Sequence, residues 1–149
     1  QTSVGKLGVL ICWDQWYHEH ASIMTLKGAE LLSYPTAIGW FDEDCKEEKE
    51  RQLDAWITIQ RSHAIANAIP VLSCNRVGFG ADTSGVMKGT RFWGSSFVCG
   101  ARGEMLAQAN DKTDTILYAN ITHERTKEVR DIWPFLRDRR PTSSGLVLT

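Results

Sequence analysis

Cys12 ends a short apolar run, residues 7–12, and is followed at once by Trp13, Asp14 and a helical pattern. A strand that stops at a thiol and turns into a helix places the sulfur at the carboxyl end of the strand, beside the first backbone amides of the helix. These unpaired N–H groups and the helix dipole favour the thiolate, which is the form that attacks a carbonyl carbon. The position therefore predicts a nucleophilic cysteine. The alternative from position alone is a free cysteine buried as a small apolar side chain.

The remaining cysteines suggest neither a disulfide framework nor a metal centre. The four cysteines, with no C-x-x-C pair, are Cys12, Cys45, Cys74 and Cys99. Such wide spacing predicts reduced thiols. His18 and His20 lie near Cys12, but a spacing of two residues puts them on different sides of a helix. We therefore expect no metal site and no cofactor.

The composition is that of an ordinary globular protein. The chain has 149 residues, 42% of them hydrophobic and 23% charged, with a formal net charge of -1. This balance excludes a general attraction to nucleic acid or to an anionic membrane, and no apolar run is long enough to cross a bilayer. We expect a cytoplasmic protein. Because the chain starts at Gln1 and reaches a strand pattern within a few residues, we also expect that an N-terminal part is missing.

The first half of the chain alternates between strand and helix patterns. Residues 6–11 predict a strand covered on both faces, because they are almost continuously apolar. Residues 17–27 predict a helix that Gly28 ends, and residues 30–34 predict a second strand that Pro35 closes. This order predicts parallel pairing of the two strands with a right-handed crossover.

The later segments extend this pattern and then change it. Residues 36–44 predict an acidic loop, residues 45–67 a long helix with one apolar stripe, and residues 70–75 a third strand. Residues 78–89 are rich in glycine and predict a loop; they lack the sequence of a phosphate-binding loop. Three strands and a helix capped by Thr122 are expected after that, at residues 91–98, 104–108, 115–121 and 122–132.

Parallel units followed by a meander predict an α/β layered fold, with helices packed on a mixed sheet. Ligands in such folds bind outside the carboxyl ends of the strands. Cys12, residues 36–40 and the pair Asn75 and Arg76 all follow predicted strands. We therefore expect these residues to converge on one cleft.

The string GKLGVLICWDQW at residues 5–16 resembles the nucleophile region of the nitrilase superfamily of carbon-nitrogen hydrolases. Further strings follow in the order of that family: GAE at 28–30, YPTAIG at 34–39, HA at 63–64, NRVG at 75–78, FWGSSF at 92–97 and WPFLRDRRP at 133–141. The resemblance covers essentially the whole chain. It is greatest to the branch that acts on N-carbamoylputrescine, through the combination of C-W-D-Q-W and F-x-R-D-R-R-P.

This resemblance implies the α-β-β-α sandwich of the nitrilase-like fold, with mixed sheets, of which residues 1–149 are the C-terminal part of a single domain. It also implies a cysteine nucleophile, a glutamate general base and a lysine that holds the oxyanion. Cys12 matches the nucleophile, and Trp13 would contribute its backbone N–H to the oxyanion hole. The glutamate and lysine lie upstream of the cysteine in the family, so we expect them in the missing N-terminal half. The resemblance implies a homo-oligomer as well.

The resemblance also predicts a small-molecule carbamoyl amine as substrate. Relatives that hydrolyse N-carbamoyl amino acids carry an arginine shortly after the cysteine, where this chain has Gln15 and Trp16. Neutral or aromatic positions permit a cationic amine, which gains cation–π contact and charge pairing. The expected substrate-binding residues are Gln15, Trp16, Thr36, Ala37, Trp40, Asp42 and Glu43. The alternative for the acidic residues is a solvated loop.

Several other polar residues have structural interpretations. Glu19 is near the nucleophile, where pairing with a neighbouring arginine is an equal alternative to a functional role. His63 is expected to be a core or surface histidine rather than a catalyst. Ion pairing around the sandwich is the better explanation for the arginine-rich tail at residues 137–140. After Pro141 the sequence departs from the family pattern.

Two alternatives to a carbamoyl amine hydrolase remain open. The first keeps the superfamily and changes the substrate to a nitrile, a simple amide or a carbamoyl acid. The second is an inactive fragment that folds only with a partner, which the absence of the glutamate and lysine favours.

Overall fold

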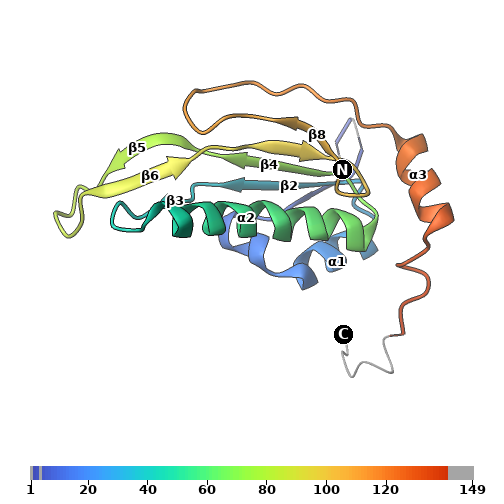
Figure 1. Ribbon diagram of the computed structural model, residues 1–149. Helices are drawn as coiled ribbons and strands as arrows, with labels where there is room; N and C mark the ends of the chain where they lie inside the picture. Colours follow the sequence, from blue (N-terminus) through green and yellow to red (C-terminus); the bar gives the residue numbers. More distant parts are fainter. Residues whose placement is uncertain (1, 4, 141–149) are drawn as a thin grey trace.

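The computed structural model describes residues 2–3 and 5–140 and shows a mixed α/β fold (Figure 1). One sheet contains β1 (Leu7–Val9), β2 (Leu31–Thr36), β4 (Val71–Asn75), β7 (Phe97–Cys99) and β8 (Met105–Gln108), in the order β1-β2-β4-β7-β8. A second sheet contains β3 (Gly39–Trp40), β5 (Val77–Ala81) and β6 (Gly89–Trp93), in the order β3-β6-β5. The helices are the 3-10 helix η1 (Cys12–Trp16), α1 (His18–Leu26), α2 (Lys46–Asn67) and α3 (His123–Ile132).

The first three strands of the larger sheet are parallel, as the strand-helix-strand pattern predicts. β1 pairs with β2 and β2 pairs with β4 in parallel, and Thr36 lies opposite Asn75 at the end of the second pairing. β7 and β8 join the same sheet in antiparallel orientation. The carboxyl ends of the three parallel strands therefore lie at the same edge of the sheet.

Helices α1 and α2 cover one face of this sheet (Figure 1). Leu32, Tyr34, Trp56 and Phe97 are fully buried between α2 and the strands, and the rings of Trp56 and Phe97 meet edge to face at 5.7 Å. Helix α2 begins after Cys45 and ends at Ala68, whose backbone takes a left-handed conformation. The prediction of one long helix over residues 45–67 is confirmed.

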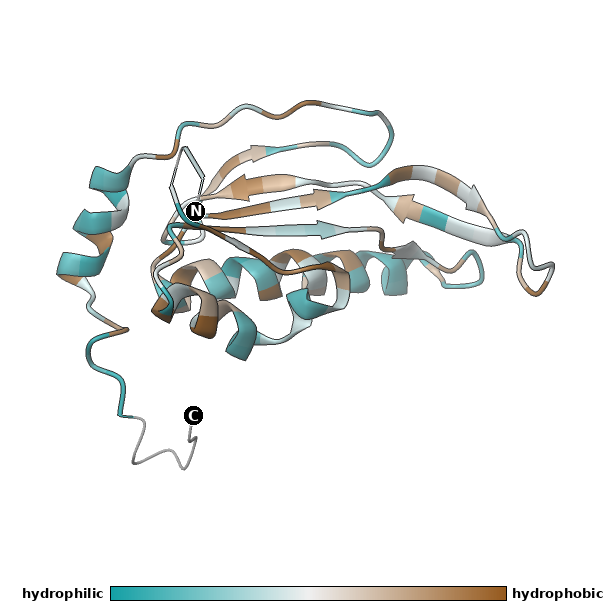
Figure 2. Ribbon diagram, turned by 180° about the vertical axis from the view of Figure 1, so that it is seen from behind, coloured by the Kyte–Doolittle hydropathy of each residue, from teal (hydrophilic) through white to brown (hydrophobic). Residues whose placement is uncertain are grey.

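The opposite face of the sheet is apolar and open in this part of the fold. Leu7 and Val9 on β1 are 37% and 49% exposed, while Gly8 between them is buried against α1 and β2. Figure 2 shows apolar, brown segments along the strands. The prediction that residues 6–11 are covered on both faces is therefore wrong for the described residues, because α1 and α2 pack on one side only.

The glycine-rich segment is a hairpin rather than a loop. β5 and β6 pair antiparallel over five residue pairs from Val77–Trp93 to Ala81–Gly89. The predicted single strand at residues 91–98 is divided into β6 and β7, because Gly94 and Ser95 both take positive φ values, 53° and 54°. β3 lies inside the segment expected to be a loop, and β2 continues through Pro35 to Thr36.

The predicted strand at residues 115–121 is absent from the described structure. The segment crosses beside β8 (Figure 1), and Ile116 and Tyr118 are 77% and 84% exposed. Strand-forming residue types are present, but the segment forms no ladder with a neighbour. The hairpin of β7 and β8 and helix α3 are confirmed, and the Thr122 hydroxyl accepts a hydrogen bond from the Arg125 backbone N–H. The tail after Pro141 lies outside the described residues.

Among the helices of the described residues, none has both the length and the apolar character needed to cross a membrane. The described part of the chain also contains no group of three or more His, Cys, Asp or Glu side chains placed to hold a metal ion.

Candidate active site

Cys12 sits three residues beyond β1, at the first position of η1, and is half-buried. Its φ of +53° is a left-handed backbone value that is rare for residues other than glycine. Such a conformation costs of order 1–3 kcal/mol and persists only where its surroundings hold it, a pattern that clusters at active sites. The candidate nucleophile is thus one of three non-glycine residues with a positive φ in the described structure, the others being Ala68 and Ser95.

Asp14 fixes the start of this turn. Its carboxylate accepts a hydrogen bond from the Ile11 backbone N–H at 3.0 Å, and its own N–H donates to the Ile11 carbonyl at 3.2 Å. Because the second bond is the first of the 3-10 helix, the N–H groups of Cys12 and Trp13 have no acceptor within the helix. They remain available to a ligand beside the sulfur. The expected helix dipole is reduced, since η1 has only five residues and α1 begins at His18.

Gln15 points into the protein interior. The residue is 0% exposed, and its side-chain carbonyl accepts a hydrogen bond from the indole N–H of Trp56 at 2.9 Å. Trp16 is partly buried against the same core. Trp13 is exposed, and its ring meets that of Trp16 at 6.3 Å. Of the two residues expected to line a substrate pocket after the cysteine, Gln15 therefore has no exposed surface in the described structure.

Three polar side chains of α2 are buried: Gln60, His63 and Asn67. The Gln60 side-chain amide donates to the Trp56 carbonyl at 3.0 Å, and the Tyr34 hydroxyl lies 2.8 Å from His63 Nδ1. Burial lowers the pKa of His63 to about 4, an effect that nearby His18 reinforces, and burial raises the pKa of Tyr34. His63 is therefore neutral at pH 7 and is a core residue, as the sequence predicts.

Asn75 joins the strand ends. Its side-chain carbonyl accepts from the Ile38 N–H at 2.9 Å, and its amide donates to the carbonyls of Ile38 and Gly94 at 3.0 and 3.1 Å. Thr36 and Ala37, both expected in the site, directly precede Ile38 and are partly exposed or exposed. Sequence reasoning placed Asn75 at this edge and missed its part in holding the segment after β2. The signal in the sequence was an asparagine at the end of a strand pattern, directly before a glycine-rich segment.

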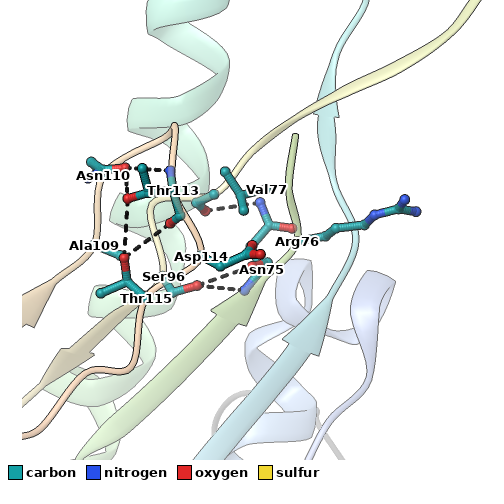
Figure 3. Close-up of a pocket in the computed structure, with 10 residues that line it drawn as sticks. Asn75, Arg76, Val77, Ser96, Ala109, Asn110, Thr113, Asp114 and Thr115 are labelled. Carbon is teal, nitrogen blue, oxygen red and sulfur yellow. Dashed lines mark hydrogen bonds between the residues drawn. The ribbon is translucent and has the colours of Figure 1, made fainter. Parts of the chain in front are cut away.

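A polar cavity of about 410 Å³ lies beside Asn75, where the chain leaves β4 and β8 and enters β7 (Figure 3). Its lining residues are Asn75, Arg76, Val77, Gly94, Ser96, Ala109, Asn110, Thr113, Asp114 and Thr115. The Arg76 guanidinium turns away from this polar group in the view and lies over the Phe92 ring at 4.5 Å. Cys12 does not line this cavity.

Asp42 and Glu43 line a different cavity, of about 380 Å³, together with Phe41 and residues 85–89. The Asp42 carboxylate is 4.0 Å from the Arg91 guanidinium, and its backbone carbonyl accepts from Lys49 Nζ at 3.1 Å. No residue of η1 lines this cavity. The predicted site residues thus fall into two groups, one at the Cys12 turn and one at the β5–β6 end of the molecule.

Trp40 belongs to the second group and is held from α2. Its indole N–H donates to the Lys49 carbonyl at 2.9 Å, and its ring lies 5.7 Å from that of Trp93. It packs partly buried against the same core cluster as Trp16. Among the described residues, Glu19 pairs with His18 at 3.4 Å and not with an arginine.

Comparison with known proteins identifies the family. A profile described as carbon-nitrogen hydrolase matches residues 1–131. The chain belongs to the carbon-nitrogen hydrolase family. The resemblance found in the sequence to the nitrilase superfamily is thereby confirmed.

Relatives with known names show which carbon-nitrogen hydrolases are similar. N-carbamoylputrescine amidase of Arabidopsis thaliana is 40% identical over 153 residues, covering 100% of this chain and 49% of that protein. Citrullinase of Francisella tularensis is 41% identical over 140 residues, covering 94% of this chain and 47% of that protein. The chain therefore spans about half the length of the curated relatives that it matches.

Solved structures confirm the nitrilase-like fold. A carbon-nitrogen hydrolase from Helicobacter pylori G27 superposes with a TM-score of 0.94 at 60% identity, covering 99% of this chain and 50% of that chain. Nit3 of Saccharomyces cerevisiae, a member of branch 10 of the nitrilase superfamily, has a TM-score of 0.70 at 26% identity. The described sheets and helices correspond to about half of the hydrolase fold.

Proposed function

We propose that Cys12 is the nucleophile of a hydrolase that cleaves the terminal carbamoyl group of an aliphatic amine, with N-carbamoylputrescine as the first substrate. One observation supports this most: Cys12 has a strained, positive-φ backbone at a parallel strand end, beside amides without helix partners. Backbone strain of this kind clusters at functional sites, and at Cys12 it coincides with a thiol at a strand end.

In the proposed reaction the Cys12 thiolate attacks the carbamoyl carbon, and the Trp13 N–H stabilises the oxyanion of the tetrahedral intermediate. The C–N bond to the terminal nitrogen breaks, that nitrogen takes up a proton and leaves as ammonia, and a carbamoyl thioester remains. Water then attacks the thioester carbon and releases the thiol. The carbamic acid formed loses carbon dioxide to give the free amine.

The proposal requires a general base and an oxyanion-holding lysine from outside these 149 residues. The glutamate and lysine of the family precede the nucleophile, and no position here matches them. The open apolar face of the larger sheet supports the same view, since a second half of the domain would bury Leu7 and Val9. In this proposal, the chain is an inactive fragment only when that second half of the domain is absent.

Citrulline hydrolysis is the second candidate, because citrullinase matches as closely as the amidases, at 41% identity. Both substrates end in the same carbamoyl group on an aliphatic nitrogen. Citrulline adds a carboxylate, which requires a cationic or multiply hydrogen-bonding partner. We propose that Asp42 and Glu43 favour the amine that lacks this carboxylate.

Ammonia release from the complete enzyme tests the nucleophile. Cys12→Ala is expected to lose at least about 10³-fold in kcat/KM on N-carbamoylputrescine. Cys45→Ser is the matched control: Cys45 is an exposed free thiol at the start of α2, and serine suits that helix-cap position. It should retain activity within twofold. Activity retained by Cys12→Ala would refute the proposed nucleophile.

Two further measurements identify the preferred substrate and show whether the 149-residue chain is active alone. A higher kcat/KM for citrulline than for N-carbamoylputrescine would replace the first substrate with the second. The 149-residue chain assayed alone should release no ammonia. Robust turnover by it would contradict the need for a glutamate and a lysine from elsewhere.

We also propose a cytoplasmic homo-oligomer. The four cysteines are all free, in agreement with a reducing compartment. Fractionation of the cells and light scattering on the complete enzyme test these two points.

A further inference from the structure

We propose that Gln15 is a positioning residue that holds the Cys12 turn through Trp56, rather than a residue that contacts substrate. The inference rests on the proposed role of Cys12 as nucleophile. Gln15 follows Cys12 by three residues, which is one turn of a 3-10 helix. It is the only residue of η1 that is buried.

The Gln15 side chain makes a directed contact across the molecule. Its carbonyl oxygen accepts from the Trp56 indole N–H at 2.9 Å, joining two residues 41 positions apart in the sequence. Both residues are 0% exposed. A hydrogen bond shielded from water is electrostatically stronger than one at the surface, and the loss of one partner leaves a buried polar group unpaired.

Trp56 is itself held firmly, so the bond is made to a fixed point. Its ring lies edge to face against Trp93 at 5.9 Å and against Phe97 at 5.7 Å. The indole can therefore not turn to follow a displaced Gln15. The turn must stay where Trp56 places it.

The two ends of the strained turn are thus fixed by different elements. Asp14 ties η1 back to Ile11 at the end of the strand, and Gln15 ties it to α2. Cys12, between Ile11 and Asp14, keeps a φ of +53°. Without the bond to α2, the Asp14 contact and the packing of Trp16 against the core remain, and we expect the backbone to relax enough to shift the sulfur relative to the Trp13 N–H.

The need to fill space in the core does not explain why position 15 holds a glutamine. The Gln15 amide nitrogen is buried without a hydrogen-bond partner among the described residues. Burying it costs free energy that methionine, of similar volume, would not lose. The hydrogen bond to Trp56 is the interaction in the structure that offsets this cost.

The test compares Gln15→Met with Gln60→Met in the complete enzyme. Gln60 is also fully buried and also bonds to Trp56, but through the backbone carbonyl and from within α2. Gln15→Met is expected to lower kcat on N-carbamoylputrescine about 10- to 100-fold, since a displacement near 1 Å can have this effect. KM should change less than twofold. The rate of Cys12 alkylation by iodoacetamide should fall at least fivefold, and Gln60→Met should leave both rates within twofold at a similar Tm.

A second pair of variants separates the bond from general stability. Gln15→Glu keeps an oxygen that accepts from Trp56 and should retain at least a third of kcat. Trp56→Phe removes the donor and should lower kcat as Gln15→Met does, with no further loss in the double variant.

Three results would overturn the proposal. A raised KM with unchanged kcat in Gln15→Met would make Gln15 a substrate contact. Equal losses in Gln15→Met and Gln60→Met would make it an ordinary core residue. Unchanged Cys12 alkylation would remove the link to the turn. Activity retained by Cys12→Ala would instead refute the proposed function, so the two failures are distinct.

Discussion

The Cys12 turn and the β5–β6 end of the molecule are held together by different kinds of contact. At the turn, one buried bond joins two residues far apart in sequence, Gln15 and Trp56, in addition to the local bond between Asp14 and Ile11. At the hairpin, the bonds are exposed and local: the Asp82 carboxylate accepts from Ser84 and from the Met87 N–H within five residues. Of the predicted site residues, Asp42 and Glu43 lie with the hairpin, whereas Trp40 is held from α2 and packs against the core.

Under the proposed function, this difference separates the residue that reacts from the residues that select the substrate. We expect that Cys12, held by the core, cannot be moved without disturbing the fold. Surface loops change at little cost to the core, so the residues that line the Asp42 cavity can vary without displacing Cys12. We therefore expect relatives of similar chemistry to accept different substrate tails.

The largest expected effect on stability is at Trp56, the residue to which the Cys12 turn is bonded. Trp56→Ala removes a fully buried ring and is expected to lower the free energy of unfolding by about 3–5 kcal/mol. Phe79→Ala, at a 46% exposed position on the hairpin, should lower it by less than about 1 kcal/mol. Urea unfolding measures both. Equal losses would show that the two regions do not differ in this way.

A pH dependence is expected from His63. Its pKa is about 4 in the folded protein and near its ordinary value of 6.5 when unfolded. Between these two pH values His63 is protonated in the unfolded chain and neutral in the folded protein. The free energy of unfolding therefore falls as pH drops from 6.5 to 4, by up to roughly 3 kcal/mol. His63→Gln keeps an acceptor for Tyr34 and should flatten this fall. His123→Gln, at an exposed position, should not.

Two glycines test how tightly the hairpin itself is packed. A Cβ at Gly89 would lie 2.2 Å from the Gly80 carbonyl oxygen, whereas one at Gly85 would meet nothing within 4 Å. Both have positive φ, 136° and 77°. Gly89→Ala should destabilise β5 and β6 by about 1–3 kcal/mol and Gly85→Ala by about 1 kcal/mol. Amide exchange over residues 77–93 reports the difference, and equal exchange would contradict it.

The smallest expected effect is on substrate binding. Asp42→Asn with Glu43→Gln should raise KM for N-carbamoylputrescine about 3- to 10-fold with kcat unchanged, because the charge on the cavity wall is removed. Asp44→Asn is the control, since Asp44 does not line the cavity. Unchanged kinetics would leave residues 42–44 as a solvated loop.

Local information explains what the sequence predicted well. Helix α2 has a clear stripe and a defined end, and Thr122 caps α3 as its type suggests. The parallel strands follow from the order of elements. These features depend on residues within a turn or two of one another.

Features that depend on distant partners were missed. Residues 78–89 contain turn-forming glycines, and only pairing across the hairpin makes strands of them. Residues 115–121 have the types of a strand but no partner in the described structure. Gln15 was expected beside a substrate because it follows Cys12, and the short 3-10 turn directs it to Trp56 instead.

Asn75 has a consequence for how ligands are selected. Its one side chain bonds the segment after β2 and the break between β6 and β7, so three parts of the chain share one fixed point. We expect a substrate bound beside this rim to meet a preformed frame, because the three segments keep their positions relative to one another.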